Sequence, residues 1–184
     1  FVYKKKTRPK GPGSLLEWNQ YYSYFRLKAT TFCQMDSRSV VTRITESLAV
    51  GCAPMFQIDL ESVQRQGIDA IVNLCGEFCD LHEIQTEAGF QVYYFPIPDE
   101  CAPDVEAMET AFEWLDNIIA SGRKVLVHCR FGVGRTGTFV TGYLMKNGLS
   151  MKAAAKALKH TRAKPTNHCQ WKLLRSYMKK LKRN

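Results

Sequence analysis

Short apolar runs alternate with amphipathic stretches along most of this chain, and that alternation restricts its fold more than any other feature. Strands are predicted at residues 44–50, 69–74, 91–97 and 124–128. Helices are predicted at residues 59–66, 81–88, 104–120, 135–147, 150–160 and 167–182. Strands that are separated by helices usually pair in parallel, because each helix carries the chain back across the sheet. The predicted fold is therefore α/β, with a mainly parallel central sheet that is flanked by helices on both faces.

The length of 184 residues fits one domain with a tail. Residues 1–42 are predicted to be a basic leader followed by an aromatic segment, partly flexible, and residues 43–184 the folded domain. The apolar residues 1–3, followed by three lysines, also fit the end of a membrane-spanning helix with its positive flank. Seven cysteines cannot all pair in disulfides, so a reducing, cytoplasmic environment is expected.

The net charge of +9 is unevenly distributed along the chain. Residues 44–122 hold fifteen acidic side chains and one Arg, whereas residues 123–184 hold sixteen Lys or Arg and no acid. Such a segment is typical of a surface that meets a phosphate ester, an acidic peptide, an anionic lipid or a nucleic acid. A solvated basic helical face remains the alternative.

The most informative segment is residues 127–137, Val-His-Cys-Arg-Phe-Gly-Val-Gly-Arg-Thr-Gly, which joins a predicted strand to a predicted helix. A helix begins there with unpaired N–H groups, and Gly132 and Gly134 allow successive N–H groups to point into one anion-binding concavity. The same field stabilises a thiolate at Cys129. Arg135 can place its planar guanidinium against two oxygens of a bound oxyanion.

The pattern His128-Cys129-x5-Arg135-Thr136 resembles the signature loop of the cysteine-based protein tyrosine phosphatases, and the chain resembles their small dual-specificity branch. The resemblance covers residues 43–182 and includes the segments 50–51, 71–74 and 97–99. It implies the dual-specificity phosphatase fold, with residues 43–184 as the catalytic domain.

The resemblance also implies roles for individual residues. Cys129 would attack phosphorus and form a phosphocysteine, and Asp99 would act first as the general acid and then as the base. Thr136 would donate its hydroxyl to the departing thiolate, and His128 would orient the loop. The phosphate would be held by the backbone and by one side chain of the loop residues Arg130, Phe131, Gly132, Val133, Gly134 and Arg135.

Several assignments stay open at this stage. Asp104 is a second candidate acid, although it is better explained as a helix cap. Gln170 could correspond to the glutamine with which some relatives position water, although its spacing does not match cleanly. The enzyme class uses no metal or cofactor. A zinc site at Cys75, Cys79, His82 and Cys101 is disfavoured, because their spacing fits no standard pattern.

The function that this resemblance predicts is dephosphorylation of phosphoserine, phosphothreonine and phosphotyrosine in proteins. The alternatives are a phosphoinositide or other lipid or inositol phosphate phosphatase, an RNA 5′-triphosphatase and an inactive phosphate-binding module. Arg130 favours the lipid alternative, whereas the apolar Val133 weakens it. The expected protein is a monomer that does not act on nucleic acid and that can bind an anionic membrane surface, at the cytoplasmic face.

Cys75 is the predicted redox partner of Cys129. It follows a run placed in the central sheet beside residues 125–128, so both strand ends should face one crevice. The segment 73–75 also resembles that of phosphoinositide phosphatases in which a cysteine captures the oxidised nucleophile. The alternative is a small residue at a strand end, and Cys79 and Cys101 compete for the role.

Overall fold

The structure, a computed structural model, describes residues 41–78 and 80–183. Its strands are β1 (Val41–Arg43), β2 (Leu48–Cys52), β3 (Ala70–Cys75), β4 (Gln91–Ile97) and β5 (Val125–Cys129). Its helices are α2 (Gln57–Arg65), α3 (Leu81–Glu87), α4 (Val105–Ala120), α5 (Gly134–Lys146), α6 (Met151–Ala157) and α7 (His168–Leu181). The predicted leader lies almost wholly outside the described residues, so the division at residue 42 stays a prediction.

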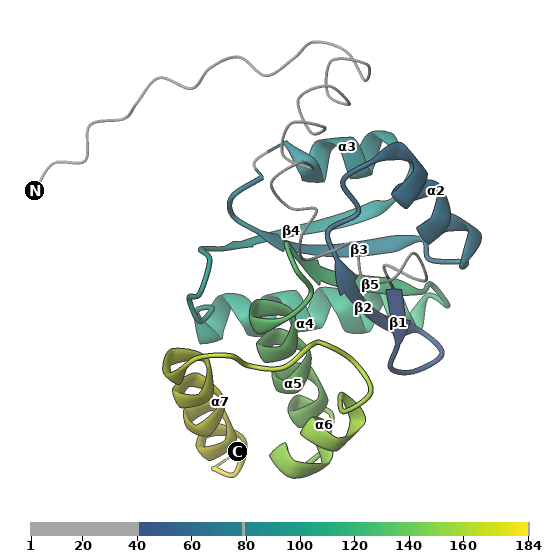
Figure 1. Ribbon diagram of the computed structural model, residues 1–184. Helices are drawn as coiled ribbons and strands as arrows, with labels where there is room; N and C mark the ends of the chain where they lie inside the picture. The colour runs from purple at the N-terminus through teal and green to yellow at the C-terminus, as the bar shows by residue number, and fades with distance from the viewer. Residues whose placement is uncertain (1–40, 79, 184) are drawn as a thin grey trace, which may run out of the picture. The chain divides into compact units, whose positions relative to one another are not determined.

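The strands form one sheet in the order β1-β2-β5-β3-β4 (Figure 1). β2, β5, β3 and β4 are parallel to one another, and only β1 is antiparallel to its neighbour. The mainly parallel sheet is therefore confirmed. Because β5 lies between β2 and β3, the segment that follows β5 is flanked by the carboxyl ends of two other strands.

The single strand predicted for residues 44–50 is wrong. The chain turns there between β1 and β2, and the Ile44 N–H donates to the Leu48 carbonyl oxygen at 2.8 Å. The Thr45 hydroxyl oxygen accepts from the Leu48 N–H at 3.0 Å, which closes the turn. An alternating pattern continues through a short hairpin turn, so it does not reveal where a strand reverses.

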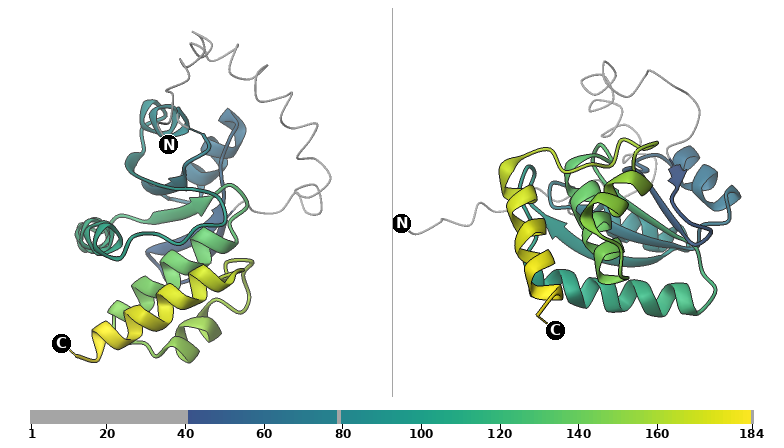
Figure 2. Two further views of the ribbon diagram at one scale, coloured as in Figure 1. Left: turned by 90° about the vertical axis from the view of Figure 1, so that its left-hand side faces the viewer. Right: turned by 90° about the horizontal axis from the view of Figure 1, so that it is seen from below.

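Helices cover both faces of the sheet, as predicted. α2 and α3 lie on one face, and α4, α5, α6 and α7 lie on the other (Figures 1 and 2). Successive residues of β5 point to opposite faces. Val125, Val127 and Cys129 pack into the larger core beneath α4, α5 and α7, whereas Leu126 packs into the core beneath α2.

Side-chain caps fix the starts of three helices where the sequence predicts them. The carboxylate of Asp104 accepts from the Ala107 N–H at 2.9 Å. Ser150 and Asn167 cap α6 and α7 in the same way. α6 ends at Ala157, short of the predicted residue 160. Within the described ranges, no helix is both long and apolar enough to cross a bilayer.

Candidate active site

The glycine-containing loop lies at the carboxyl end of β5, where Cys129 is the last strand residue and is 3% exposed. α5 begins five residues later at Gly134, so the loop opens a helix as predicted. Gly132 has a φ of +66°, and a Cβ there would lie 2.4 Å from the Gly51 carbonyl oxygen. Only glycine fits this position, because the backbone conformation and the close approach both exclude a side chain. The loop is thus held against the end of β2.

The segment before α7 packs against the other side of the loop. A Cβ on Gly137 would lie 2.2 Å from the backbone nitrogen of Lys164, so α5 and this segment are in direct contact. Gln170 is 1% exposed, and a Cβ on Gly134 would come within 3.1 Å of its Nε2. Gln170, in the first turn of α7, therefore lies against the start of α5. Its spacing in the sequence was only a weak indication of this position.

Arg135 is buried beneath the loop and is held by an acidic side chain that sequence reasoning missed. Its Nη1 donates to Oε2 of Glu77 at 2.6 Å, and its Nη2 donates to Oε1 at 2.7 Å. Nη1 also donates to the Ile97 carbonyl oxygen at 3.0 Å. Burial by itself would lower the pKa of Arg135, but the hydrogen bonds that it donates to Glu77 and the nearby negative charges raise it. The guanidinium therefore stays charged and is fixed in one plane.

The ion pair with Arg135 also changes the pKa of Glu77. Burial would raise the pKa of this carboxyl group, but the hydrogen bonds and charge of Arg135 lower it below its ordinary value. Glu77 follows β3, whereas Arg135 lies in α5, 58 residues further along the chain. A local sequence pattern carries no signal for a pair so far apart.

Asp99 lies on a separate loop beside Arg135. Its Oδ1 is 2.9 Å from Nη2 of Arg135, and its side chain is 58% exposed. The Asn167 amide donates to the Glu100 carbonyl oxygen, and Gln170 donates to the Cys101 carbonyl oxygen at 3.4 Å. The start of α7 thus holds the loop that carries Asp99, whereas Asp104 is engaged as a helix cap.

His128 belongs to a chain of buried polar groups beneath the loop. The amide of Asn73 donates to Oε1 of Gln85 at 3.1 Å, which leaves the Gln85 amide 2.9 Å from Nε2 of His128. Nε2 therefore accepts, and the proton lies on Nδ1, 3.8 Å from the sulfur of Cys75. Burial lowers the pKa of His128 to about 3, and the charge of Arg135 adds to that effect. His128 is therefore neutral and adds no positive charge to the loop, and its role in orienting the loop stays a prediction.

Cys75 is fully buried and belongs to a small cluster with Ala53 and Leu81. Burial raises the pKa of its thiol, and the negative charges of Glu77 and Cys129 raise it further. Cys52, for which the sequence carries no signal, lies directly opposite Cys129 in the parallel pairing of β2 with β5. The redox role of Cys75 therefore stays a prediction, and Cys52 is an additional thiol near Cys129.

Two further features of the loop bear on its chemistry. The hydroxyl of Thr136 is buried and has no hydrogen-bond partner within the described ranges. The guanidinium of Arg130 lies over the rings of Phe131, at 4.9 Å, and Phe78, at 5.6 Å. Together these residues give the loop a cationic, aromatic rim. No group of three or more His, Cys, Asp or Glu side chains in the described part of the chain could hold a metal ion.

A cysteine at a strand end, a glycine-containing loop at a helix start and a buried guanidinium thus lie together, an arrangement that can bind an oxyanion next to a nucleophile. The family model described as "Polymorphic toxin system, DSP-PTPase phosphatase" matches residues 50–149. The chain therefore belongs to the DSP-PTPase phosphatase family.

The human protein named Dual specificity protein phosphatase 2 is 32% identical over 90 residues, which is 48% of this chain and 27% of that protein. The chain thus spans about a quarter of the length of the curated relatives that it matches. The crystal structure of Tk-PTP in the active form has 28% sequence identity and a TM-score of 0.69, and the match covers 77% of this chain and 98% of that one. PTPMT1 in complex with PI(5)P, at 18% identity and a TM-score of 0.66, shares the fold over 79% of this chain and 98% of its own.

Proposed function

We propose that this chain hydrolyses phosphomonoesters through a phosphocysteine at Cys129, and that its substrates are proteins phosphorylated on serine, threonine or tyrosine. The observation that carries the proposal is the arrangement of Cys129 at the foot of a loop whose arginine is buried, charged and held by Glu77. A buried guanidinium beside a cysteine and a helix start forms an anion site next to a nucleophile.

In the first step, the Cys129 thiolate attacks phosphorus and forms the S–P bond as the bond to the leaving oxygen breaks. Backbone N–H groups of residues 130–135 and the Arg135 guanidinium stabilise the charge on the equatorial oxygens. Glu77 and the Ile97 carbonyl occupy both protons of Nη1 and one of Nη2. The phosphate therefore uses the Nε edge of Arg135, together with the Nη2 proton that Asp99 contacts in the free protein.

Once a bound phosphate has displaced its carboxylate from Arg135, Asp99 takes up a proton from solvent and donates it to the leaving oxygen in this step. Its carboxylate contacts Arg135 before substrate binds, and a bound phosphate would take over that contact and release Asp99 toward the leaving group. In the second step, the Asp99 carboxylate accepts a proton from water as the water oxygen attacks phosphorus. The S–P bond then breaks, inorganic phosphate leaves, and the buried hydroxyl of Thr136 donates a hydrogen bond to the regenerated thiolate.

Similarity to proteins named dual specificity protein phosphatases favours protein substrates. A second candidate function, hydrolysis of phosphoinositides, is favoured by Arg130, whose stacked guanidinium adds a positive charge at the rim. It is also favoured by the fold shared with PTPMT1, which was crystallised with PI(5)P. We further propose residues 43–184 as the catalytic domain of a monomer in the cytoplasm, where Cys129 would remain reduced.

The test compares the wild-type chain with Cys129→Ser in chelator-containing buffer, with p-nitrophenyl phosphate, a phosphopeptide panel and a phosphoinositide panel. Wild type should hydrolyse peptides that carry phosphoserine, phosphothreonine or phosphotyrosine. Cys129→Ser should hydrolyse none of them while still binding inorganic phosphate. Cys52→Ser is the matched control, because it removes the neighbouring thiol without removing the nucleophile. Turnover by Cys129→Ser would overturn the mechanism. If wild type hydrolysed phosphoinositides but no phosphopeptide, the substrates would be lipids and not proteins.

A further inference from the structure

α6, α7 and the turns that end them carry seven exposed cations: Lys152, Lys156, Lys159, Lys172, Arg175, Lys179 and Lys182. We call this set the α6–α7 basic face. None of the seven has an ion-pair partner among residues 41–78 and 80–183. This contrasts with Arg65, Lys146 and Lys180, which pair with Glu61, Asp116 and Glu109.

Helical phase shows that these cations point away from the domain. At about 100° per residue, the four cations of α7 fall within an arc of about 80°. That arc lies opposite Gln170, Leu174 and Tyr177, the buried residues of the helix. On α6, Lys152 and Lys156 lie opposite the buried Ala154. Both helices pack against α5, on the side of the sheet that faces away from α2 and α3 (Figures 1 and 2).

Like charges on the basic face repel one another and destabilise α7. Lys172, Arg175, Lys179 and Lys182 are spaced three or four residues apart, and like charges at these spacings destabilise a helix. Favourable interaction with the helix dipole explains Lys179 in the last turn, but it does not explain Lys172 or Arg175 in the middle of α7. A bound anionic surface would offset this repulsion.

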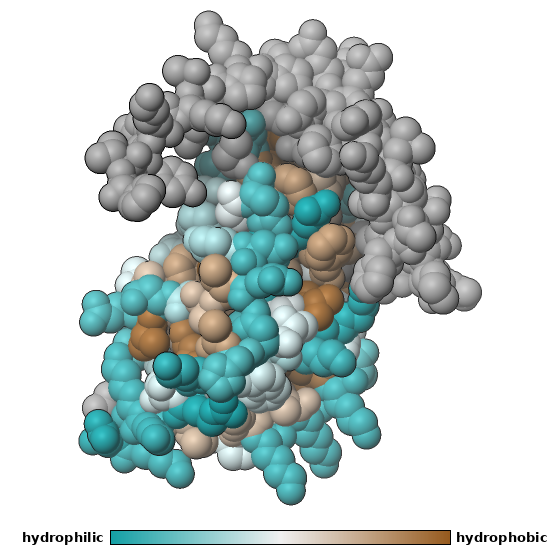
Figure 3. Space-filling view, turned by 60° about the vertical axis from the view of Figure 1, so that its left-hand side comes forward, coloured by the Kyte–Doolittle hydropathy of each residue, from teal (hydrophilic) through white to brown (hydrophobic). Residues whose placement is uncertain are grey.

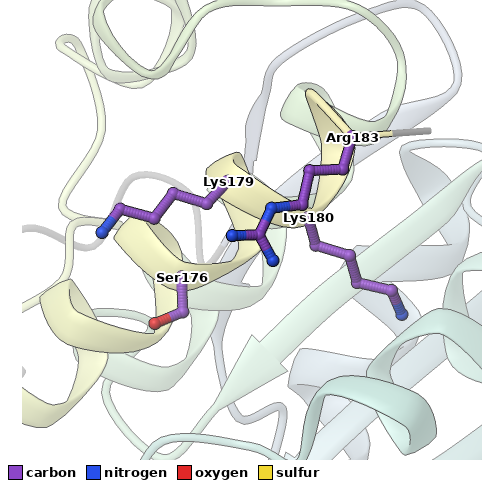
Figure 4. A pocket seen from close by; sticks show the side chains of 4 residues that line it. All are labelled: Ser176, Lys179, Lys180 and Arg183. Atoms are coloured by element: carbon purple, nitrogen blue, oxygen red, sulfur yellow. The ribbon is translucent and has the colours of Figure 1, made fainter.

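Hydrophilic side chains project from the lower part of the molecule in Figure 3. At the end of α7, Ser176, Lys179, Lys180 and Arg183 line an open hollow of about 320 Å³, with Lys179 and Lys180 extending to opposite sides (Figure 4). Lys180 is engaged by Glu109, so Lys179 and Arg183 are the cations that remain available to an anion at this hollow.

From this arrangement we propose that the α6–α7 basic face docks the domain on a membrane surface rich in anionic phospholipid. Each cation near such a surface adds attraction without requiring a shaped pocket, so outward-pointing charges on two helices suffice. Anchoring a peptide in a pocket or stacking nucleic acid bases requires exposed apolar or aromatic side chains. Among the described residues, the large hydrophobic side chains that are exposed are Ile58 and Leu149, and neither is aromatic.

Docking along α7 would place the membrane beside the active site. α7 begins at the loop that carries Asp99, through the bonds of Asn167 and Gln170 to the carbonyl oxygens of Glu100 and Cys101. The proposal does not depend on whether the substrate is a lipid or a protein, because it concerns where the domain is held.

The test measures sedimentation of the full chain with vesicles of phosphatidylcholine alone and of phosphatidylcholine with about one third phosphatidylserine, at low and high salt. Wild type should bind only the anionic vesicles and should release them as salt rises. The triple variant Lys172→Gln, Arg175→Gln, Lys179→Gln should bind about 100-fold more weakly, since each cation contributes about fivefold.

The matched control is Lys4→Gln, Lys5→Gln, Lys6→Gln, which removes the same charge from the predicted leader and should retain most of the binding. Turnover of p-nitrophenyl phosphate and thermal unfolding check that both variants are folded. Loss of binding in the leader variant alone, or equal binding of wild type to both vesicles, would overturn the proposal. If the basic face bound polyglutamate or RNA but no vesicles, its partner would be an acidic protein or a nucleic acid and not a membrane.

Discussion

The loop at residues 129–135 and the α6–α7 basic face both carry positive charge, yet their surroundings differ. Arg135 is 2% exposed, lies in a plane set by Glu77 and contacts Asp99. Lys172 and Arg175 are exposed and extend away from the domain. A buried charge requires a partner of fixed geometry, because the interior does not solvate it, whereas an exposed charge is solvated by water. Substitutions should therefore affect catalysis and stability at the loop, but only binding at the basic face.

The largest effect is expected from Arg135→Lys. A lysine keeps the positive charge but loses the planar fork that holds both Glu77 and the phosphate, so kcat should fall by about 10³–10⁴-fold. Steady-state kinetics on p-nitrophenyl phosphate measure it, with Arg175→Lys on the basic face as the control. Comparable activity of the two variants would remove the distinction between buried and exposed cations.

Asp99→Asn should lower kcat by about 10²–10⁴-fold on an alkyl phosphate, because the leaving oxygen then departs without a proton. The loss should be smaller on p-nitrophenyl phosphate, whose leaving group needs no proton. Asp104→Asn is the matched control and should leave both turnover and stability nearly unchanged, because asparagine caps a helix about as well as aspartate. An equal loss on both substrates would argue against Asp99 as the general acid.

Glu77→Gln tests whether Arg135 needs its buried partner. The amide keeps the shape but loses the charge-assisted bonds, so kcat should fall by about 10–100-fold and the free energy of unfolding should decrease by about 1.5–3 kcal/mol. Urea unfolding and kinetics measure the two effects, and Glu61→Gln on the exposed side of α2 is the control. A variant that kept both wild-type activity and wild-type stability would show that Glu77 does not position Arg135.

Acid should destabilise the loop region through His128. Its pKa is about 3 in the folded protein against an ordinary value of 6.5, so the unfolded chain binds more protons between these pH values. The free energy of unfolding should therefore decrease as pH falls from 6.5 toward 3, by up to about 1.4 kcal/mol per pH unit from this group. Urea unfolding at pH 7 and pH 5 measures the slope. His128→Gln should show a shallower slope than His160→Gln, which replaces an exposed histidine, and equal slopes would contradict the assignment.

The smallest effect is expected at the basic face. Lys172→Gln combined with Arg175→Gln should change the free energy of unfolding by less than about 0.5 kcal/mol, because both side chains are exposed. Relief of like-charge repulsion makes a slight stabilisation the expected sign. Thermal unfolding at low and high salt measures it. A large loss of stability would show that these cations have a structural partner.

The sequence alone determined the features that depend on neighbours along the chain. The alternation of apolar runs predicted the parallel sheet with its helices, and Asp104, Ser150 and Asn167 marked helix starts because a cap acts within three residues. The loop from Cys129 to Arg135 was predicted for the same reason, since its parts are local.

Only the tertiary structure decided what lies against that loop. Glu77 reaches Arg135 across 58 positions, and Gln85 reaches His128 across 43, so no periodicity could pair them. Register placed Cys52 opposite Cys129, and a turn at Thr45 occupies the first part of the strand predicted at residues 44–50. Such contacts depend on how the strands are ordered in the sheet, and chain packing, rather than any local pattern, sets that order.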